Sequence, residues 1–422
     1  MGSGLLLGCI ADDFTGATDL ANNLVRNGMR TVQTIGVPAG PLEVDTDAVV
    51  VALKTRTTPP AEAVQQSLEA LRWLRAQGAR QIYFKYCSTF DSTAHGNIGP
   101  VTDALMDALD ADFTIATPAF PDNQRTVFKG YLFVGDVLLS ESGMRDHPLT
   151  PMTDANLVRV LQAQCRRKVG LIDYRTVAAG EAAIRQRIGA LRSAGVSIAV
   201  VDALSNDDLL RLGPALKDLK LVTAGSGVAI GLPANFGLGA SEGAGRLPSG
   251  LGARAVVAGS CSEATNRQVR AFTQAGGPAM AIDPLRLAAG EDVVARTLAW
   301  AKPLLAKGPV LVYSTADPGA VKSVQGRLGV EQAGAMVERA IAAIARGLVD
   351  LGVRQLVVAG GETSGACVQA LGVRQLQIGP QIDPGVPWCW GRDGAGHHLH
   401  MALKSGNFGA DDFFSKAFAL LK

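Results

Sequence analysis

A chain of 422 residues is too long for one ordinary hydrophobic core, which predicts two domains. With 47% apolar residues, 18% charged residues and 49 glycines, the composition is that of a globular protein and excludes intrinsic disorder. A formal net charge of +2 gives no electrostatic reason to expect nucleic acid or a membrane surface as a partner.

The sequence shows no membrane or export signal. No apolar run is long enough to span a bilayer, and the short apolar stretch at residues 5–10 leads directly into Asp12 and Asp13, which makes it a poor signal peptide. The six cysteines lie far apart and form no C-x-x-C pair, as expected for reduced thiols. We therefore expect a cytoplasmic protein.

The first chemical signal is a pair of carboxylates after the first predicted strand. Residues 5–11 are apolar, and Asp12-Asp13-Phe14-Thr15-Gly16 separates them from a predicted helix at residues 17–27. Open α/β sheets bind their ligands at the carboxyl ends of strands, where this pair lies. One carboxylate can face a ligand while the other caps the helix, or both can be caps. We favour a role in a site because one cap is enough.

Strands and helices then alternate along the chain. The predicted strands are residues 31–36, 48–53 and 81–84, with a predicted amphipathic helix at residues 60–77. A polar loop at residues 85–99 follows and carries hydroxyl groups, a cation, a carboxylate and a histidine. A polyhydroxy acid needs such donors and a cation for its carboxylate, although the loop can also simply cap itself. Lys85, Arg56 and Lys129 are the candidate clamps for a substrate carboxylate.

The rest of the first half continues the pattern, with one weak dinucleotide signal. Further strands are predicted at residues 113–117, 169–172, 197–201 and 221–223, with helices at 154–164, 181–193 and 207–216, and a hairpin outside the parallel sheet at 126–139. Gly225-Ser226-Gly227 then forms a loose G-x-G pattern. A dinucleotide site needs an acidic residue at the end of the next strand, and Glu242 lies in no strand. A nicotinamide-dependent dehydrogenase is therefore the weaker hypothesis.

A glycine-rich stretch at residues 237–252 is the best linker in the chain. It divides the sequence into an N-terminal domain, residues 1–236, and a C-terminal domain, residues 253–422. The two halves are both α/β in pattern. The predicted fold is therefore two α/β domains with mainly parallel sheets.

Three polar turns follow strands of the second domain. The predicted strand at residues 253–258 leads into GSCS at 259–262 and a helix at 263–275. The strand at 310–313 leads into STAD at 314–317, with a helix at 332–351 further on. The strand at 355–359 leads into GGETSG at 360–365 and a helix from residue 366. In a right-handed parallel sheet these turns share one edge. Their N–H and hydroxyl donors, together with helix dipoles, suit a nucleotide polyphosphate. Each turn alone is equally typical of a strand-to-helix connection without a ligand.

The C-terminal run ends in another glycine turn. Residues 398–403 alternate as in a half-buried strand, so His398 and His400 share a face and supply at most two zinc ligands. Lys404 comes next and is either a structural cation or a phosphate contact. A glycine turn at residues 405–409 follows it.

Phosphoryl transfer is the chemistry that fits these features. The sequence has no P-loop, protein-kinase or G-x-S-x-G motif. The reaction needs a bound nucleotide such as ATP, Mg²⁺ on its phosphates, a positioned alcohol and exclusion of water. Closure of two domains supplies the last two, so we predict an active site in the interdomain cleft. Asp12 or Asp13 would orient or deprotonate the attacking hydroxyl.

Several long stretches of the chain resemble the four-carbon acid sugar kinase family. They are ADDFTGATD, KYCSTFDSTAHGNIGP, GYLFVGDVLLSESGMRDHPLTPMTD, GSCSEATNRQV, GGETSG and ALKSGNFG, and the resemblance covers nearly the whole chain. It implies an N-terminal sugar-acid-binding domain and a C-terminal nucleotide-binding domain. It further implies ATP-dependent phosphorylation of the 4-hydroxyl of 3-oxo-tetronate, with threonate and erythronate as the alternative substrates.

The same resemblance implies a set of site residues. The implied ATP contacts are Ser260, Ser262, Gly360, Gly361, Glu362, Thr363 and Gly406. The implied substrate contacts are Asp12, Asp13, Thr15, Arg56, Lys85, Ser88, Asp91, His95 and Asn97. Relatives that act on threonate or erythronate tend to have an arginine at the position of His95, so His95 marks the oxo-acid branch.

A second class of function stays open on the sequence. A two-domain protein that binds a sugar acid without chemistry would need no ATP. In both readings the expected partners are small molecules, with no nucleic acid and no membrane. The sequence also leaves a homodimer open.

Overall fold

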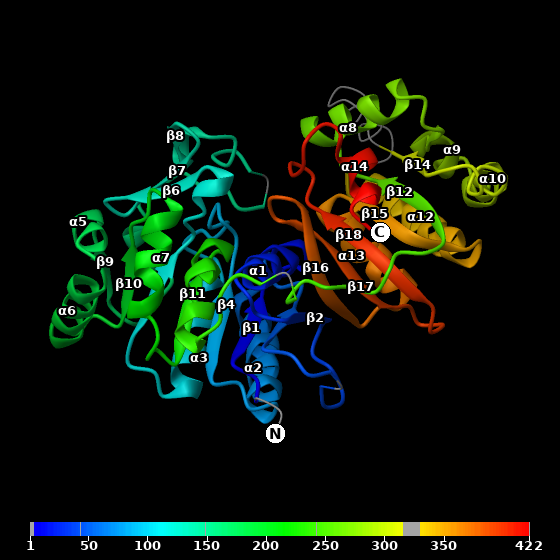
Figure 1. Ribbon diagram of the computed structural model, residues 1–422. Coiled ribbons are helices and arrows are strands. Elements are labelled where there is room, and N and C mark those ends of the chain that lie inside the picture. Colours follow the sequence, from blue (N-terminus) through cyan, green and yellow to red (C-terminus); the bar gives the residue numbers. More distant parts are fainter. Residues whose placement is uncertain (1–3, 43, 148, 242, 315–329, 422) are drawn as a thin grey trace. The chain divides into compact units, whose positions relative to one another are not determined.

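The computed structural model describes residues 4–42, 44–147, 149–241, 243–314 and 330–421. The chain forms two compact units, Met1–Gly245 and Arg246–Lys422 (Figure 1). Each unit has a sheet with helices on both faces, which confirms the predicted α/β fold class. No helix in the described ranges combines the length and apolar character needed to cross a membrane.

The first unit is organised around a parallel sheet. Its strand order is β2–β3–β1–β4–β11–β5–β10–β9, and every pairing in that order is parallel. The central strands are short apolar runs buried along their whole length, as expected when helices cover both faces. The strands are β1 (Leu7–Ala11), β2 (Thr31–Ile35), β3 (Ala48–Ala52), β4 (Gln81–Lys85), β5 (Thr114–Thr117), β9 (Val169–Ile172), β10 (Ile198–Val201) and β11 (Leu221–Ala224).

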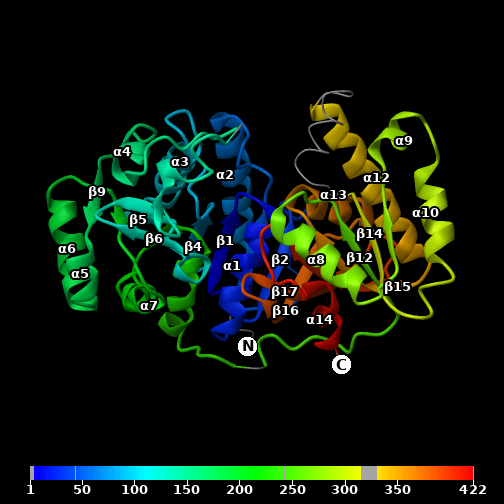
Figure 2. The ribbon, with the colours of Figure 1, turned by 90° about the horizontal axis from the view of Figure 1, so that it is seen from above.

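Helices of the first unit lie on the two faces of this sheet. Figure 2 shows α2, α3 and α4 on one face and α1 and α7 on the other. This division follows from right-handed crossovers that run in opposite directions along the sheet. The helices are α1 (Phe14–Arg26), α2 (Pro60–Ala76), α3 (Ile98–Leu109), α4 (Leu157–Gln162), α5 (Tyr174–Ala178), α6 (Glu181–Ser193) and α7 (Asn206–Ala215).

A small antiparallel sheet stands apart from the parallel one. It consists of β6 (Arg125–Phe128), β7 (Tyr131–Val134) and β8 (Val137–Leu138), in that order. The predicted hairpin at residues 126–139 is therefore confirmed and gains a short third strand. Gly130 and Gly135 have φ of 78° and 60°, which fits the tight turns between these strands.

The sheet of the second unit is mixed. Its order is β13–β14–β12–β15–β18–β17–β16; the pairings from β13 to β18 are parallel, and β18–β17–β16 are antiparallel. The strands are β12 (Ala253–Ala258), β13 (Ala279–Ala281), β14 (Val310–Tyr313), β15 (Val353–Ala359), β16 (Gln375–Asp383), β17 (Val386–Arg392) and β18 (His398–Lys404). Its helices are α8 (Glu263–Gln274), α9 (Pro284–Ala288), α10 (Val293–Ala301), α12 (Val330–Asp350), α13 (Gly361–Leu371) and α14 (Phe413–Ala419).

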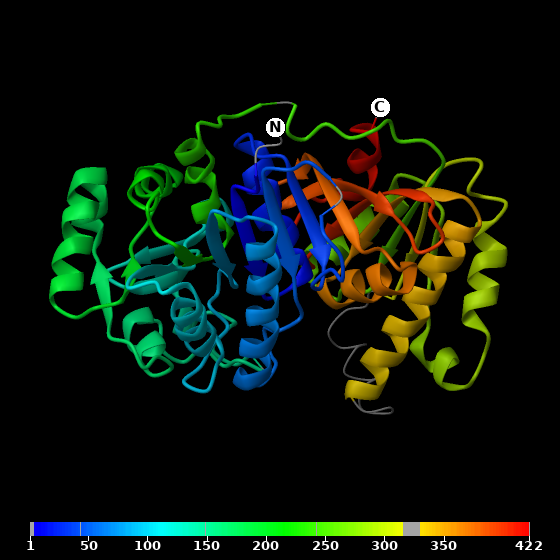
Figure 3. The same cartoon turned by 90° about the horizontal axis from the view of Figure 1, so that it is seen from below.

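The core of the second unit centres on a buried tryptophan. Trp388 is fully buried among apolar side chains of the sheet and of α8 and α14, and its Nε1 donates to the carbonyl oxygen of Ala417 at 2.8 Å. On the opposite face α12 packs along α13 (Figure 3). The central strands β12 and β15 are thus covered on both sides, which fixes the positions of the turns that follow them.

Two helices begin earlier than the sequence predicts. The turn at residues 360–365 was expected to precede a helix from residue 366, but α13 already begins at Gly361. Likewise α1 begins at Phe14 because the Asp13 side chain accepts from the N–H of Gly16 and caps the helix. The predicted turn at residues 314–317 lies outside the described residues apart from Ser314.

Candidate functional site

The backbone at the carboxyl end of β1 brings three segments of the first unit together. β1 lies between β3 and β4, and all three run in the same direction. The N–H of Asp12 donates to the carbonyl oxygen of Lys85 at 3.1 Å, and the N–H groups of Thr55 and Arg56 donate to that of Asp12 at 2.9 and 3.2 Å. Residues far apart in sequence therefore meet at one edge of the sheet, as the topology predicts.

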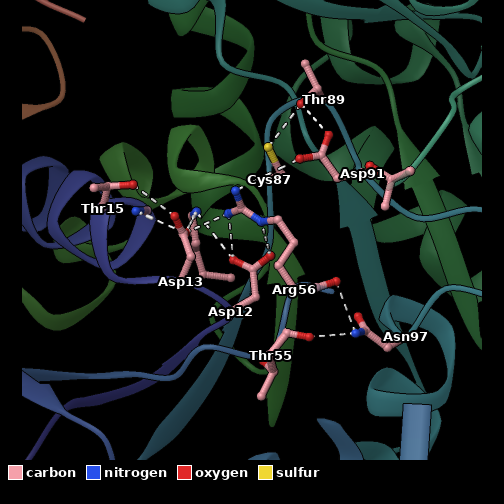
Figure 4. A network of polar contacts seen from close by, with 12 residues as sticks. Asp12, Asp13, Thr15, Thr55, Arg56, Cys87, Thr89, Asp91 and Asn97 are labelled. Atoms are coloured by element: carbon pink, nitrogen blue, oxygen red, sulfur yellow. Dashed lines mark hydrogen bonds and ion pairs between the residues drawn. The ribbon is translucent and has the colours of Figure 1, made fainter. Parts of the chain in front are cut away.

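Arg56 is the centre of this cluster (Figure 4). Its Nε and Nη2 donate to the two carboxylate oxygens of Asp12 at 2.8 and 3.0 Å, and its Nη2 also donates to Oδ1 of Asp13 at 2.6 Å. Its Nη1 lies 4.0 Å from Oδ2 of Asp91 and donates no hydrogen bond to a described residue. The Arg56 side chain is 24% exposed, so this group can reach a small molecule.

Lys85 is the second cation of the cluster and is almost completely buried. Its Nζ lies 3.7 Å from Asp12 and 3.4 Å from Asp13. A Cβ at Gly16 would lie 1.8 Å from this nitrogen, so only glycine leaves room for Lys85 here. Burial by itself would lower the pKa of Lys85, but the charges of Asp13 and Asp12 raise it above its usual value. Lys85 therefore stays charged.

Asp13 is held as a carboxylate by its surroundings. Its Oδ1 accepts from the N–H of Gly16 at 3.0 Å, and its Oδ2 accepts from the Thr15 hydroxyl at 2.9 Å. Burial alone would raise the pKa of Asp13, but the charges of Arg56 and Lys85 outweigh it and hold that pKa well below its usual range. Asp13 is thus a weak proton acceptor and serves both as the helix cap and as an ionic partner.

The polar loop after β4 closes one side of the cluster. The Thr89 hydroxyl donates to Oδ1 of Asp91 at 2.6 Å, and Sγ of Cys87 lies 3.0 Å from the same hydroxyl. Phe90 and Asp91 have φ of 65° and 39°, in the left-handed region that non-glycine residues rarely adopt. Such strain is typical of functional loops, where the surrounding structure holds it in place.

Asn97 ties the far end of this loop to the segment that carries Arg56. Its Nδ2 lies 2.7 Å from the carbonyl oxygen of Thr55 and 3.2 Å from that of Arg56. These contacts hold the backbone of residues 55 and 56, and this backbone sets the position from which the Arg56 side chain extends. Asn97 thus positions Arg56 through the main chain.

Three other predicted residues take no part in this network. Ser88 is half-buried, and His95 is exposed with its backbone N–H 3.3 Å from the Thr93 hydroxyl. Lys129, a candidate clamp from the sequence, pairs with Asp173 at 3.2 Å in another part of the unit. The network of Asp12, Asp13, Arg56 and Lys85 therefore forms without them.

In the second unit the turns after β12 and β18 interlock. The hydroxyls of Ser262 and Thr265 donate to the carbonyl oxygen of Gly406 at 2.6 and 2.9 Å. A Cβ at Gly406 would lie 2.3 Å from Oγ of Ser260, so this close approach requires glycine. Ser260, Ser262 and Gly406 are therefore neighbours, although 144 residues separate the last two.

The turn after β15 lies against the same group. The N–H of Gly360 donates to the carbonyl oxygen of Lys404 at 2.8 Å, and Gly360 has φ of 127°, which favours glycine. A Cβ at Gly259 would lie 2.3 Å from Oγ1 of Thr363, whereas one at Gly361 would meet no atom within 4 Å in the part of the chain that the structure describes. The first turns of α8 and α13 thus begin beside one another, and helix N-termini with free N–H groups favour anions.

Some members of these two clusters were missed on the sequence. Thr265, Cys87 and Thr89 were not singled out as site residues. Thr265 carried a usable signal, because it stands at the third helical position after the cap Ser262, from which a polar side chain can reach back to the cap. Cys87 and Thr89 had none, since their contacts depend on the unusual backbone at Phe90 and Asp91.

The glycine pattern at residues 225–227 is a packing turn. A Cβ at Gly225 would lie 2.9 Å from the carbonyl oxygen of Pro118, and one at Gly227 would lie 2.4 Å from that of Ala119. The Ser226 hydroxyl donates to the buried carboxyl of Asp19. Because backbone already fills the space beside these glycines, a dinucleotide does not fit there.

The histidines of β18 form no metal site. The His398 ring stacks on Trp390 at 5.0 Å between centroids, and Nε2 of His400 lies 2.9 Å from the carbonyl oxygen of Pro248. Among the residues that the structure describes, no group of three metal-binding side chains comes together. Zinc binding by this strand therefore has no structural support.

Comparisons with known proteins match both units. A family model described as a sugar-binding N-terminal domain matches residues 7–232, and one described as a nucleotide-binding C-terminal domain matches residues 255–414. A 3-oxo-tetronate kinase of Burkholderia multivorans is 63% identical over 420 residues, which are 99% of this chain and 97% of that protein. One of Pseudomonas fluorescens is 61% identical over 421 residues, with 99% and 97% covered.

Two solved structures share the fold along the whole chain. A Haemophilus influenzae protein is 46% identical with a TM-score of 0.83, and the match covers 98% of this chain and 100% of that one. A Salmonella typhimurium protein described as a putative tRNA synthase is 47% identical with a TM-score of 0.89, and 99% of each chain is covered.

Proposed function

The chain belongs to the four-carbon acid sugar kinase family, and on this premise we propose that it transfers the terminal phosphoryl group of ATP to the 4-hydroxyl of 3-oxo-tetronate. The observation that carries the proposal is the identity of 61–63% with 3-oxo-tetronate kinases over nearly the full length. The product would be 3-oxo-tetronate 4-phosphate. The clusters in the two units would supply the groups that such a reaction needs.

The first unit would bind the sugar acid. Nη1 of Arg56 is a charged donor at a partly exposed position, and its planar guanidinium suits a carboxylate. Asp12 and Asp13 hold this cation and Lys85 in place. Because phosphoryl transfer passes through a loose transition state, positioning of the hydroxyl contributes more than its deprotonation. The low pKa of Asp13 is compatible with an orienting role for that carboxylate.

The second unit would bind ATP at the turns after β12, β15 and β18. Ser260 would present its hydroxyl, and Gly406 and the first residues of α13 would present N–H donors, which are the groups that hold phosphates. Ser262 would act through Gly406, because its hydroxyl donates to the carbonyl oxygen of that residue. Gly361 leaves the space beside the helix start open. Phosphate oxygens would accept from these donors, and the helix dipoles would stabilise their charge.

Mg²⁺ would accompany ATP. In kinases this ion binds mainly to the phosphates, with one or two protein carboxylates, so the lack of a three-residue cluster among the described residues fits such a site. Glu362 is the carboxylate at the start of α13 and would be the protein ligand nearest in sequence to the phosphate turn. The ion would neutralise charge on the transferred group.

A coupled assay of ADP release tests the proposal. The purified protein would be given ATP, Mg²⁺ and, in parallel, 3-oxo-tetronate generated in situ, threonate or erythronate. We expect turnover with the oxo acid and little with the other two. Turnover only with a plain tetronate would keep the family and overturn the substrate. Absence of ADP release with all three would leave a sugar-acid-binding protein, which calorimetry with the same acids would detect.

A further inference from the structure

Lys404 is a fully buried cation beneath the glycine turn of the second unit. Its side chain is 0% exposed. Its Nζ lies 3.1 Å from the Thr265 hydroxyl oxygen, 3.0 Å from the carbonyl oxygen of Ser405 and 2.8 Å from that of Gly406. All three donors of the ammonium group are therefore used on α8 and on the turn itself.

No carboxylate of the described residues forms an ion pair with this ammonium group. Glu263 and Glu362 begin the two neighbouring helices, and Asp383 of β16 pairs with Lys416. Burial lowers the pKa of Lys404 to about 7, and no charged neighbour contributes to that shift. Lysines are almost never fully buried unless paired, so a buried ammonium group that is held only by neutral oxygens favours an anion nearby.

The peptide groups above Lys404 show where that anion would bind. In a trans peptide the C=O and the N–H of one unit point in opposite directions, and the described chain has no cis peptide. The carbonyl oxygens of Ser405 and Gly406 point at Lys404, so the N–H groups of Gly406 and Asn407 point away from it. Neither N–H donates to another described residue. Two adjacent unused N–H groups form a cradle for an anion.

The cradle lies at the proposed nucleotide site. Gly406 is in contact range of Ser260, and its carbonyl oxygen also accepts from Ser262 at the start of α8. The backbone of Lys404 itself accepts from the N–H of Gly360, at the start of α13. Lys404 therefore connects all three turns to which ATP is assigned.

We propose that Lys404 is a positioning residue for the nucleotide phosphates: by binding the carbonyl oxygens of Ser405 and Gly406, it aims the N–H groups of Gly406 and Asn407 at the phosphate chain. This inference rests on the nucleotide half of the proposed function. Lys404 makes no direct contact with the ligand. Its charge reaches the phosphates through one layer of peptide, which is short enough for a strong interaction in a buried site.

The proposal has a consequence that a purely structural lysine lacks. An anion beside the cradle favours the charged form of Lys404, so nucleotide binding raises its pKa. Above neutral pH the free protein holds Lys404 mostly without its proton, and binding then takes up a proton from solution. Affinity for nucleotide should accordingly fall as the pH rises above the pKa that Lys404 has in the free protein.

Isothermal titration calorimetry measures this proton directly. ADP would be titrated at about pH 8 into the whole protein, in buffers of different ionisation enthalpy, because both phosphates of ADP are then fully ionised. We expect the wild type to take up more than about half a proton per ADP. Adenosine has no phosphate and should bind without uptake, if it binds.

Matched variants separate charge from packing. Lys404→Met keeps a long unbranched side chain, and we expect it to abolish the uptake and to raise the Kd for ADP about tenfold or more. Thr265→Val removes the hydrogen bond to Gly406 and one of the three acceptors of Lys404, but it keeps the ammonium group and its contacts with the carbonyl oxygens of Ser405 and Gly406, so uptake should persist. Lys302→Met removes an exposed charge of the same unit and should leave both quantities unchanged. Circular dichroism checks the fold of each variant.

The outcomes separate this inference from the proposed kinase activity. Undiminished proton uptake in Lys404→Met, or no uptake in the wild type, overturns the role of Lys404 even if the protein phosphorylates a sugar acid. Lys404-dependent uptake in a protein without kinase activity sustains the inference and removes the proposed reaction. If Lys404→Met does not fold, the wild-type measurement alone decides, since absence of uptake contradicts the proposal.

Discussion

Arg56 and Asp12 face each other in a two-point pair, with Nε to Oδ2 at 2.8 Å and Nη2 to Oδ1 at 3.0 Å. The pair places both oxygens of Asp12 on one guanidinium and leaves Nη1 of Arg56 directed elsewhere. The carboxylate therefore acts as the fixed support of a cation. In the proposed reaction the sugar acid would contact Arg56 directly, and Asp12 would act only by holding Arg56 in position.

Replacement of Arg56 by lysine should impair the reaction strongly. The shorter ammonium side chain would keep one positive charge but could not bind two oxygens of Asp12 and still offer a planar donor to the substrate. We expect Arg56→Lys to lower kcat/KM for the sugar acid about 100-fold, with a smaller change in the KM for ATP. Steady-state kinetics with each substrate varied in turn measures both effects.

Arg30→Lys is the matched control for this prediction. Arg30 also binds a carboxylate through two nitrogens, Nε and Nη2, which lie 3.1 and 2.8 Å from the oxygens of Asp47. It lies at the amino end of β2, away from the strand ends that carry the cluster. If kcat/KM for the sugar acid falls equally in both variants, the effect of Arg56→Lys comes from the loss of an arginine–carboxylate pair in general and does not show that Arg56 binds the substrate.

Asp13→Asn tests whether the charge at the start of α1 is needed for turnover. Asparagine is as good a helix cap as aspartate, so the variant keeps the cap while Lys85 and Arg56 lose a partner. We expect kcat to fall about 100-fold and the KM for ATP to change little. Asp173→Asn is the control, because Asp173 also caps a helix and pairs with a lysine, Lys129. A loss of kcat of only a few-fold would make Asp13 a cap alone.

The same residue predicts a change in acid stability. The pKa of Asp13 is lowered in the folded state, so near pH 4 the unfolded chain binds more protons and the free energy of unfolding rises with pH. The contribution of this carboxylate is present above about pH 4, its unfolded pKa, and is lost as the pH falls toward the folded value. Urea unfolding of the wild type and Asp13→Asn should therefore converge below about pH 4. A constant difference down to about pH 2.5 would contradict the assignment.

Gly361→Val tests the phosphate turn without disturbing the fold. A Cβ at Gly361 would meet no atom of the described residues within 4 Å, so the melting temperature should change little while the valine occupies the space assigned to phosphate. We expect the KM for ATP to rise about tenfold or more, because the side chain would displace the ligand from the helix N-terminus. Gly189→Val adds the same side chain at an open helical position of α6 and reports the helix-propensity effect alone. An unchanged KM for ATP would place the nucleotide elsewhere.

The alternation of short apolar runs and amphipathic helices was enough to predict the fold class, but the strands β13, β16 and β17 were missed. β16 and β17 contain Pro380 and Pro387, which cannot donate to a ladder and argue against strands. The structure accommodates the first by register shifts in the β16–β17 pairing between Ile378 and Gln381. Pairing of β16 with β17, and of β17 with β18, thus overrides the local sequence signal. No pattern within either run reveals these pairings.

Prediction of the first cluster succeeded only in part. The edge of a parallel sheet brings Asp12 and Lys85 together, and that edge follows from strand order alone. The sequence offered Arg56, Lys85 and Lys129 as equivalent substrate clamps, because it does not show that Asp12 and Asp13 hold two of these cations. The left-handed backbone at Asp91 was equally unforeseeable, since residues other than glycine rarely adopt it.

His95→Arg tests the basis of substrate choice. His95 is exposed at the end of the polar loop, two residues before Asn97, which binds the carbonyl oxygens of Thr55 and Arg56. An arginine at this position would add a permanent charge and hydroxyl-binding donors close to the Arg56 segment. We expect the variant to lose activity on the oxo acid and to gain it on threonate or erythronate, with the ratio of kcat/KM values shifting about tenfold. His147→Arg, on a different loop, is the control for the added charge. Equal changes in kcat/KM on all three acids would show that His95 affects catalysis without selecting the substrate.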